Sequence, residues 1–303
     1  MSGVPGRRGP GAGGRARERL SGPWRDAWHR LRRNRMAVAS GVFLALLAAL
    51  AFGAPWIPGL PSPTAQDLAL GATPPAPQHP LGTDLLGRDV LSRTLHGGRI
   101  SLAVGLLGML VSLVIGVLYG ALAGYRGGRT DELMMRFVDV LYSLPYLFLV
   151  ILLLVFFSRS LLMLFVALGA VQWLTMARIV RAQVLSLKQQ AFVEAARALG
   201  SGDGAILLRH LVPNTLGPVI VYATLTVPAV MLQEAFLSFL GLGVEPPAAS
   251  WGTLVADGAS VISLFPWLVA APGVVLSLAL FCFNFLGDGL RDALDPRDSR
   301  PVA

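Results

Sequence analysis

Six apolar stretches, each about as long as a lipid bilayer is thick, constrain what this chain can fold into. A bilayer core is about 30 Å thick, so a helix needs roughly 20 mostly apolar residues to cross it. The stretches cover 36–54, 100–124, 133–157, 161–178, 214–241 and 266–287. None of them alternates in the manner of β-barrel strands. We therefore predict an all-α integral membrane protein with six transmembrane helices.

The composition agrees with this prediction and excludes several kinds of site. Charged residues make up 14% of the 303 positions, against about 25% in soluble domains. The single Cys282 excludes a disulfide within the chain and a cysteine-based metal cluster. The four histidines lie far apart, and no His-Glu-x-x-His motif occurs. We therefore expect no catalytic residue and no metal site.

The basic residues predict the orientation in the membrane. Lysine and arginine stay on the cytoplasmic side of membrane proteins. Of the 25 basic residues, 21 fall in four segments that share one side if the N-terminus is inside: 1–35, 125–136, 178–213 and 288–303. Both termini are therefore predicted to be cytoplasmic. Because these residues flank the spans instead of forming one patch, we expect no nucleic-acid partner.

Residues near 24–35 leave two interpretations open. Trp24, Trp28 and Leu31 recur at helical spacing among several arginines. This pattern suits a short helix in the inner headgroup region of the membrane. A basic flank that only sets the topology explains the same residues.

The longest outer segment, residues 55–99, has two halves of different character. Residues 55–80 contain eight prolines, which predict an extended loop. The second half is dense in glycine, aspartate and arginine, and its spacing allows opposite charges to pair on helical turns. We expect this polar segment to pack against the membrane domain. Its candidate residues are Gly82, Asp84, Gly87, Arg88, Asp89, Ser92, Arg93 and Arg99.

The inner segment 178–213 carries the strongest functional signal. Residues 191–199 are mostly alanine, glutamate, arginine and leucine, which are strong helix formers, with Gly200 placed to end the helix. Asp203 is expected to cap a second helix, from 205 to 211. Small and apolar side chains on one face suit docking into a groove of a partner, with Glu194 and Arg197 on the opposite face. The residues of the docking face are Phe192, Ala195, Ala196 and Leu199.

At these positions the sequence resembles a known family. Glu194-Ala195-Ala196, Gly200 and His210-Leu211-Val212-Pro213 resemble the EAA loop of ABC importer permeases. The outer motif is similar to that of the dipeptide/oligopeptide and nickel subfamily, in particular its second, C-type permease. The segments around Arg136 and Asp139, from Glu234 to Gly243, and from Phe285 to Asp292 match the same subfamily. The resemblance runs from about residue 30 to 296.

The resemblance implies a type I ABC importer permease fold and a division of the chain. Residues 1–35 would be a basic cytoplasmic tail, and 36–97 the first transmembrane helix with its proline-rich loop. Residues 98–290 would be the permease domain of five helices, with the EAA loop at about 189–213, and 291–303 a cytoplasmic tail. The location implied is the cytoplasmic membrane of a bacterium or archaeon.

The resemblance also implies a function and partners. The chain would form half of the translocation pathway of an ATP-driven, binding-protein-dependent importer of dipeptides or oligopeptides. Its partners would be a second, B-type permease in a heterodimer, two ABC ATPase subunits, an extracytoplasmic substrate-binding protein and membrane lipid. The residues that couple to the ATPase would be Glu194, Ala195, Ala196, Gly200, His210 and Pro213.

The chain has no means of hydrolysing ATP. A P-loop needs a lysine after a glycine-rich turn, and the only lysine, Lys188, lies in Leu187-Lys188-Gln189. We expect no cofactor on this chain, with ATP and magnesium bound by the partner ATPase.

Two alternatives stay open. Ionisable residues within a membrane are often functional, so Asp139 and Glu234 allow an ion-gradient-coupled secondary transporter. A structural pair with Arg136 accounts for Asp139 equally well, and Glu234 either lines the pathway or hydrogen-bonds a neighbouring helix. Nickel or glutathione-like solutes are alternative cargoes.

Overall fold

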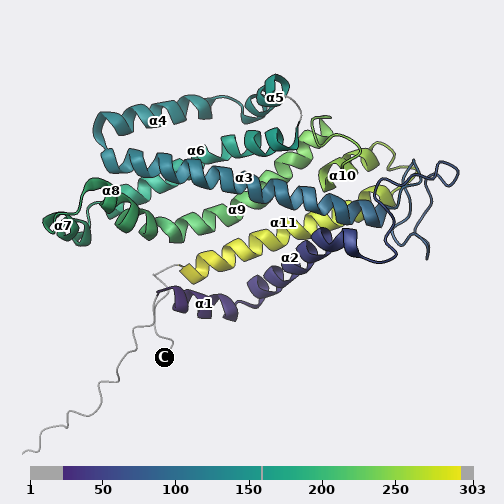
Figure 1. Ribbon diagram of the computed structural model, residues 1–303, viewed down its shortest axis with the longest axis horizontal. Coiled ribbons are helices and arrows are strands. Elements are labelled where there is room, and N and C mark those ends of the chain that lie inside the picture. Colours follow the sequence, from purple (N-terminus) through teal and green to yellow (C-terminus); the bar gives the residue numbers. More distant parts are fainter. Residues whose placement is uncertain (1–22, 158–159, 295–303) are drawn as a thin grey trace, which may run out of the picture.

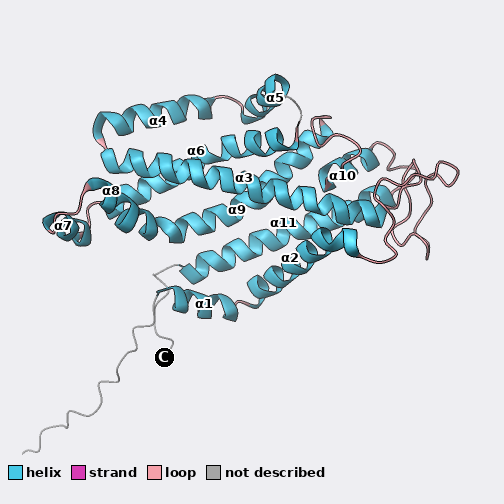
Figure 2. Cartoon of the chain, viewed as in Figure 1, coloured by secondary structure: helices cyan, strands magenta, loops and turns pink. Residues whose placement is uncertain are grey.

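The computed structural model describes residues 23–157 and 160–294, which form a helical bundle (Figures 1 and 2). Within these ranges there is no β-strand, and two isolated β-bridges lie in the loop between 57 and 89. Five helices are long and apolar enough to cross a membrane, which confirms the predicted all-α membrane fold. They are α2 (Arg35–Gly53), α3 (Val90–Arg126), α6 (Leu161–Leu187), α9 (Val212–Phe239) and α11 (Trp267–Leu294).

The predicted span 133–157 is not one straight helix. It is divided into α4 (Gly128–Ser143) and α5 (Tyr146–Phe157), whose axes differ by 87°. The cause is Pro145, which lacks an amide N–H and disfavours the helical conformation of the residue before it. Leu144 is accordingly extended, with φ −77° and ψ 137°. Apolar length alone did not reveal this turn, because apolar residues continue on both sides of Pro145.

The short elements gather at the two ends of the bundle (Figure 1). We call one the α7 end, which holds α7 (Ala191–Ala198), α8 (Asp203–Ala205) and the π-helix η2 (Ile206–Leu211). The other is the loop end, which holds η1 (Ala54–Trp56), the loop 57–89 and α10 (Trp251–Ala259). The last turns of α11 lie toward the α7 end, as does α1 (Pro23–Arg33).

Glycines bring α3 and α6 into close contact. Gly116, Gly120 and Gly124 lie along one stripe of α3, opposite Met176, Ala177 and Arg181 of α6. A Cβ atom on Gly120 would overlap the backbone of Ala177. Small residues stabilise membrane helix pairs in this way, because lipid supplies no hydrophobic drive for association. The glycine stripe thus serves packing within the chain.

The segment before the first span is helical. In α1 Ala27 is buried, while Trp28 is 52% exposed and the guanidinium of Arg32 lies 4.8 Å from its ring centre. Asn34 separates α1 from α2 and caps α2 by accepting a hydrogen bond from the amide of Ala37. The first part of the basic tail, residues 1–22, lies outside the described residues.

Candidate functional site

The helix α7 projects at one end of the bundle and is anchored on one side only (Figure 1). Val193 and Ala196 are buried against Ile206 and Leu211 of η2. Glu194 and Ala195 are exposed, as are Phe192 (37%) and Leu199 (87%). The predicted docking face is therefore wrong in one residue: Ala196 faces this chain and not a partner.

Gly200 ends α7 in the way the sequence predicts. Its φ is +82°, a left-handed conformation that glycine adopts without strain. The amide of Ser201 donates to the carbonyl of Ala196 at 3.0 Å, and the amide of Gly200 donates to that of Arg197 at 2.9 Å. These two bonds form a Schellman motif. Because the space around Gly200 is open, a side chain here would strain the backbone without meeting a neighbour.

Three side chains tie the base of this region to α3. The hydroxyl of Tyr125, near the end of α3, donates to Asp203 at 2.5 Å. Lys188, at the end of α6, donates to the carbonyl of Tyr125, and its ammonium lies 5.3 Å from the centre of the tyrosine ring. We call Tyr125, Lys188 and Asp203 the Tyr125 hub. The sequence analysis did not predict this hub. The position of the only lysine, Lys188, was the one feature of the sequence that pointed to it.

The second helix of the segment differs from its prediction. Asp203 lies inside α8 and Gly202 is the N-cap, so the Asp203 carboxylate is directed to Tyr125 instead of capping. Residues 206–211 are π-helical, a conformation that is rare and concentrates at functional sites. His210 is half-buried there, and its carbonyl accepts a hydrogen bond from Asn214 at 2.5 Å. Pro213 is exposed in the first turn of α9.

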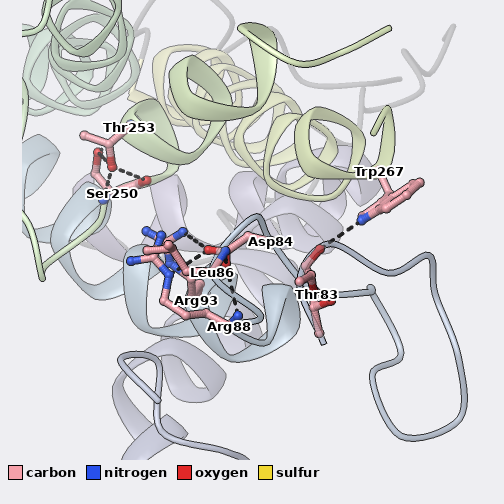
Figure 3. A network of polar contacts seen from close by, with 9 residues as sticks. Thr83, Asp84, Leu86, Arg88, Arg93, Ser250, Thr253 and Trp267 are labelled. Carbon is pink, nitrogen blue, oxygen red and sulfur yellow. Dashed lines mark hydrogen bonds and ion pairs between the residues drawn. The ribbon is translucent and has the colours of Figure 1, made fainter. Parts of the chain in front are cut away.

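At the loop end, Asp84 is the centre of the polar motif (Figure 3). One carboxylate oxygen accepts from the amides of Leu86 and Arg88, at 2.9 and 3.0 Å. The other accepts from the guanidinium groups of Arg88 and Arg93, at 2.7 and 2.5 Å. Asp84 and Arg93 are both buried. The predicted charge pairing is present, but residues 84–88 form a turn and not a helix.

Asp89 has a different role from the one its spacing suggested. Instead of pairing with an arginine, it caps α3 by accepting from the amide of Ser92 at 2.7 Å, and its other oxygen lies 2.9 Å from His79. The hydroxyl of Ser92 donates to the carbonyl of Pro61 at 2.6 Å. An aspartate before a helix is a strong N-cap, so capping determines where α3 begins.

The motif glycines fold the loop against the bundle. Gly82 and Gly87 both have positive φ, at 79° and 71°. A Cβ atom on Gly87 would overlap the backbone of Asp67, and one on Gly82 would lie 2.9 Å from the ring of Trp267. The indole of Trp267 donates to the carbonyl of Thr83 at 3.2 Å (Figure 3). Arg99 is half-buried and lines a separate cavity beside α3.

A cavity of about 300 Å³ opens beside the Asp84 network. It is lined by Asp84, Arg88 and Arg93 and, from α10, by Asp257. Burial raises the pKa of Asp257, while Arg93 and Arg88 act against that rise. Sequence reasoning missed Asp257, because no spacing rule connects it to a motif more than 160 residues earlier.

Asp139 pairs across helices, not along its own. Its carboxylate accepts from Arg178 of α6 at 2.7 Å, and Arg136 instead lies 3.6 Å from Glu132. The predicted pair with Arg136 is therefore wrong, although a structural pair does account for Asp139. A second bridge joins the same two helices, since Arg181 donates twice to Asp131, at 2.5 and 2.6 Å. Both bridges hold α4 against α6.

Glu234 is buried at the junction of α9 and α10, with 1% of its surface exposed. One carboxylate oxygen accepts from the hydroxyls of Ser250 and Ser238, at 2.6 and 2.9 Å. Ser250 is also the N-cap of α10 and forms a capping box with Thr253 (Figure 3). Among the described residues these contacts favour a structural role for Glu234, namely holding the start of α10.

Comparison with known proteins places the chain in a family. The family model of the binding-protein-dependent transport system inner membrane component matches residues 116–300. A second model, the N-terminal TM domain of oligopeptide transport permease C, matches residues 22–75.

Relatives of known name agree over most of their length. The chain is 51% identical to the oligopeptide transport system permease protein OppC of Haemophilus influenzae, over 91% of this chain and 89% of that protein. It is 47% identical to the dipeptide transport system permease protein DppC of Bacillus subtilis, over 90% of this chain and 85% of that protein.

A solved structure shares the fold. The MetNI methionine ABC transporter in inward facing conformations matches with a TM-score of 0.55 and 19% identity, over 68% of this chain and 96% of that one. The family match covers more than half of the chain, and the identities to named relatives are near 50%. This chain therefore belongs to the family of inner membrane components of binding-protein-dependent transport systems.

Proposed function

We propose that this chain is one of two permease subunits of an ATP-driven importer of dipeptides or oligopeptides. The names of its relatives, oligopeptide and dipeptide permeases, support the peptide cargo. We further propose that α7 docks into a cleft of an ABC ATPase, which binds the ATP and magnesium. The permease domain would cover 98–290, with the basic tail before it at 1–35.

One observation carries the coupling role of α7. The helix is fixed to the bundle through Val193 and Ala196, and it presents Phe192 and Leu199 to the outside. Large exposed apolar side chains at one projecting end are typical of an interaction surface. Gly200 ends α7, and His210 and Pro213 lie in the elements that follow it. These three residues would act by positioning α7, whereas Glu194 and Ala195 would contact the ATPase.

The two ends of the bundle indicate where the remaining partners would bind. The described termini lie toward the α7 end (Figure 1), and the basic residues predict a cytoplasmic location for that end. The loop end, with the Asp84 motif, would then receive an extracytoplasmic binding protein. The second permease, of the B type, would complete the pathway in a heterodimer.

An ion-coupled carrier receives less support from the geometry. Such a carrier needs an intramembrane carboxylate that exchanges its ion or proton during transport. Glu234 is instead bonded to two serine hydroxyls, and Asp139 is paired with Arg178.

The test uses the complete transporter in proteoliposomes, with its binding protein outside and ATP inside. Uptake of radiolabelled trialanine is measured for the wild type and for Gly200→Leu. We expect the wild type to import trialanine only with ATP, and Gly200→Leu to lose at least nine tenths of that uptake while still inserting into the membrane. Uptake by Gly200→Leu at the wild-type rate would contradict the coupling role, and wild-type uptake driven by an ion gradient would contradict ATP coupling.

A matched control comes from the other end of the bundle. Gly241 has φ +73° and open space around it, as Gly200 has. The amides of Gly241 and Leu242 donate to Ser238 and Leu237 in the same Schellman pattern. Gly241→Leu therefore imposes the same backbone strain far from α7, and we expect it to retain most of the uptake. Competition by excess unlabelled glutathione or nickel salt would identify those cargoes.

A further inference from the structure

A third cavity opens where the broken span meets two long helices. Its volume is about 240 Å³. Tyr142 and Leu144 contribute from the end of α4 and the bend, and Tyr146 from the start of α5. Gln172 and Thr175 contribute from α6, and Gln233 from α9. None of these sequence positions belongs to a motif that the sequence analysis singled out.

The polar lining of this cavity is uncharged and lies at membrane depth. Gln172 is 11 residues into α6, about 16 Å along the helix axis at the usual rise per residue. Tyr142 lies 14 residues into α4, about 21 Å from its start. Polar groups in such a position are costly unless they face a cavity or a partner. No aspartate, glutamate, lysine, arginine or histidine lines the space.

Gln233 supplies the cavity with a polar group that has no hydrogen-bond partner. Within the described part of the chain, its side-chain oxygen is buried and has no hydrogen bond. A buried polar atom without a partner destabilises a fold, and each such atom calls for an explanation, such as a ligand. Tyr142 and Tyr146, 52% and 40% exposed, border the same space and offer hydroxyls. The guanidinium of Arg178 lies 4.2 Å from the centre of the Tyr142 ring, and Tyr146 adds a second aromatic ring.

We propose that this cavity holds one amide unit of a peptide during its passage, with the side-chain oxygen of Gln233 accepting a hydrogen bond from a peptide N–H. The inference rests on the proposed function and names the part of the pathway that contacts the cargo. An uncharged amide pairs with glutamine and hydroxyl groups whatever side chains the peptide carries, so the site suits cargo of varied sequence. The volume is just below the roughly 300–1,000 Å³ of small-molecule pockets. It fits one unit of a peptide, with the second permease enclosing the rest.

The test compares trialanine with two analogues in which one or the other amide N–H is replaced by an ester oxygen. ATP-dependent uptake of each is measured in proteoliposomes, for the wild type and for Gln233→Met, a change of similar length that removes the amide. The ratio of amide to ester uptake is then compared between the two transporters. Because the binding protein is the same in both, its own preference cancels from this comparison.

We expect the ratio for at least one analogue to fall about tenfold in Gln233→Met, as the loss of one buried hydrogen bond predicts. Gln233→Glu keeps the acceptor oxygen and is expected to keep the wild-type ratio. Asn284→Leu is the matched control, because the Asn284 amide donates to the carbonyl of Leu280 in its own helix, away from the cavity. Its ratio should equal that of the wild type.

The outcomes separate the two proposals. Equal ratios for the wild type and Gln233→Met, with uptake intact, would overturn this inference and leave the importer function in place. If Gln233→Met does not assemble, Gln233→Glu supplies the test. A tenfold fall of its amide-to-ester uptake ratio, although the acceptor oxygen is kept, would equally overturn this inference. Wild-type transporter that takes up no trialanine would overturn the proposed function itself.

Discussion

At the scale of single residues, one carboxylate organises each polar cluster. Asp84 accepts four hydrogen bonds and pairs with two arginines at the loop end. Glu234 accepts two hydroxyl hydrogen bonds at the start of α10. Asp84 shares its cavity with Asp257, and both Asp84 and Glu234 are explained by the hydrogen bonds that they accept. Their replacement has different consequences, because only Asp84 compensates buried charge.

Asp84→Ala should destabilise the loop end strongly. It leaves Arg93, which is buried, without its carboxylate, and breaking a buried ion pair costs about 3 kcal/mol or more. We expect a lower melting temperature in detergent and faster proteolysis between residues 57 and 89. The exposed pair Arg136–Glu132 supplies the control, since Glu132→Ala should leave the melting temperature unchanged. Equal melting temperatures for Asp84→Ala and the wild type would contradict this account.

Glu234→Gln tests whether the carboxylate of Glu234 has a structural role or must bind and release a proton. Glutamine keeps a side-chain oxygen that accepts from Ser250 and Ser238, so we expect at least half of the ATP-dependent peptide uptake to remain. Glu234→Leu removes both bonds and should lower the stability of the subunit. Complete loss of uptake in Glu234→Gln, in a subunit of normal stability, would indicate that this carboxylate must release a proton.

At the scale of elements, the joints between helices decide how motion can pass through the bundle. The glycine stripe of α3 fits the backbone of α6, and two salt bridges join α4 to α6. The Tyr125 hub connects the ends of α3 and α6 to α8. A displacement of α7 that moves α8 would therefore reach α3 through the contact of Asp203 with Tyr125.

Tyr125→Phe tests this connection. It removes a hydrogen bond to a carboxylate, worth about 1.5–3 kcal/mol, and it keeps the ring over Lys188. We expect intact assembly but a lower ratio of peptide imported to ATP hydrolysed, because α3 no longer follows α7 closely. The control is Tyr119→Phe, whose hydroxyl donates to the carbonyl of Met134 and not to the α7 end. An unchanged ratio in Tyr125→Phe would show that the hub has no part in coupling.

At the scale of the whole molecule, both ends of the bundle expose apolar side chains, but they are built differently. The α7 end carries exposed apolar side chains, Phe192, Leu199 and Leu208. The loop end carries a proline-rich loop fixed by buried ion pairs. If the proposed orientation holds, these ends face the cytoplasm and the outside.

Cysteine labelling tests this orientation. In a Cys282→Ser background, Ala65→Cys at the loop end and Gly202→Cys at the α7 end each introduce a thiol at an exposed position. A membrane-impermeant thiol reagent applied to intact cells, or to spheroplasts where an outer membrane is present, should label Cys at 65 and not at 202. Inverted membrane vesicles should give the reverse pattern. Labelling of both positions from one side would contradict the proposed topology.

The sequence by itself determined the class of fold, five of the spans, the helix at 191–198 and its glycine stop. These features depend on local length, hydropathy and backbone preference, which neighbouring residues reveal. The tertiary structure decided the 87° bend at Pro145, the partner of Asp139, the inward face of Ala196 and the contact of Tyr125 with Asp203. The bend is local to Pro145, but its angle is not visible in hydropathy. The partner of Asp139 and the contact of Tyr125 with Asp203 join residues 39 and 78 positions apart, which leave no periodic trace in one sequence. The cavity at Gln233 is a property of the same kind, because it exists only where α4, α5, α6 and α9 meet.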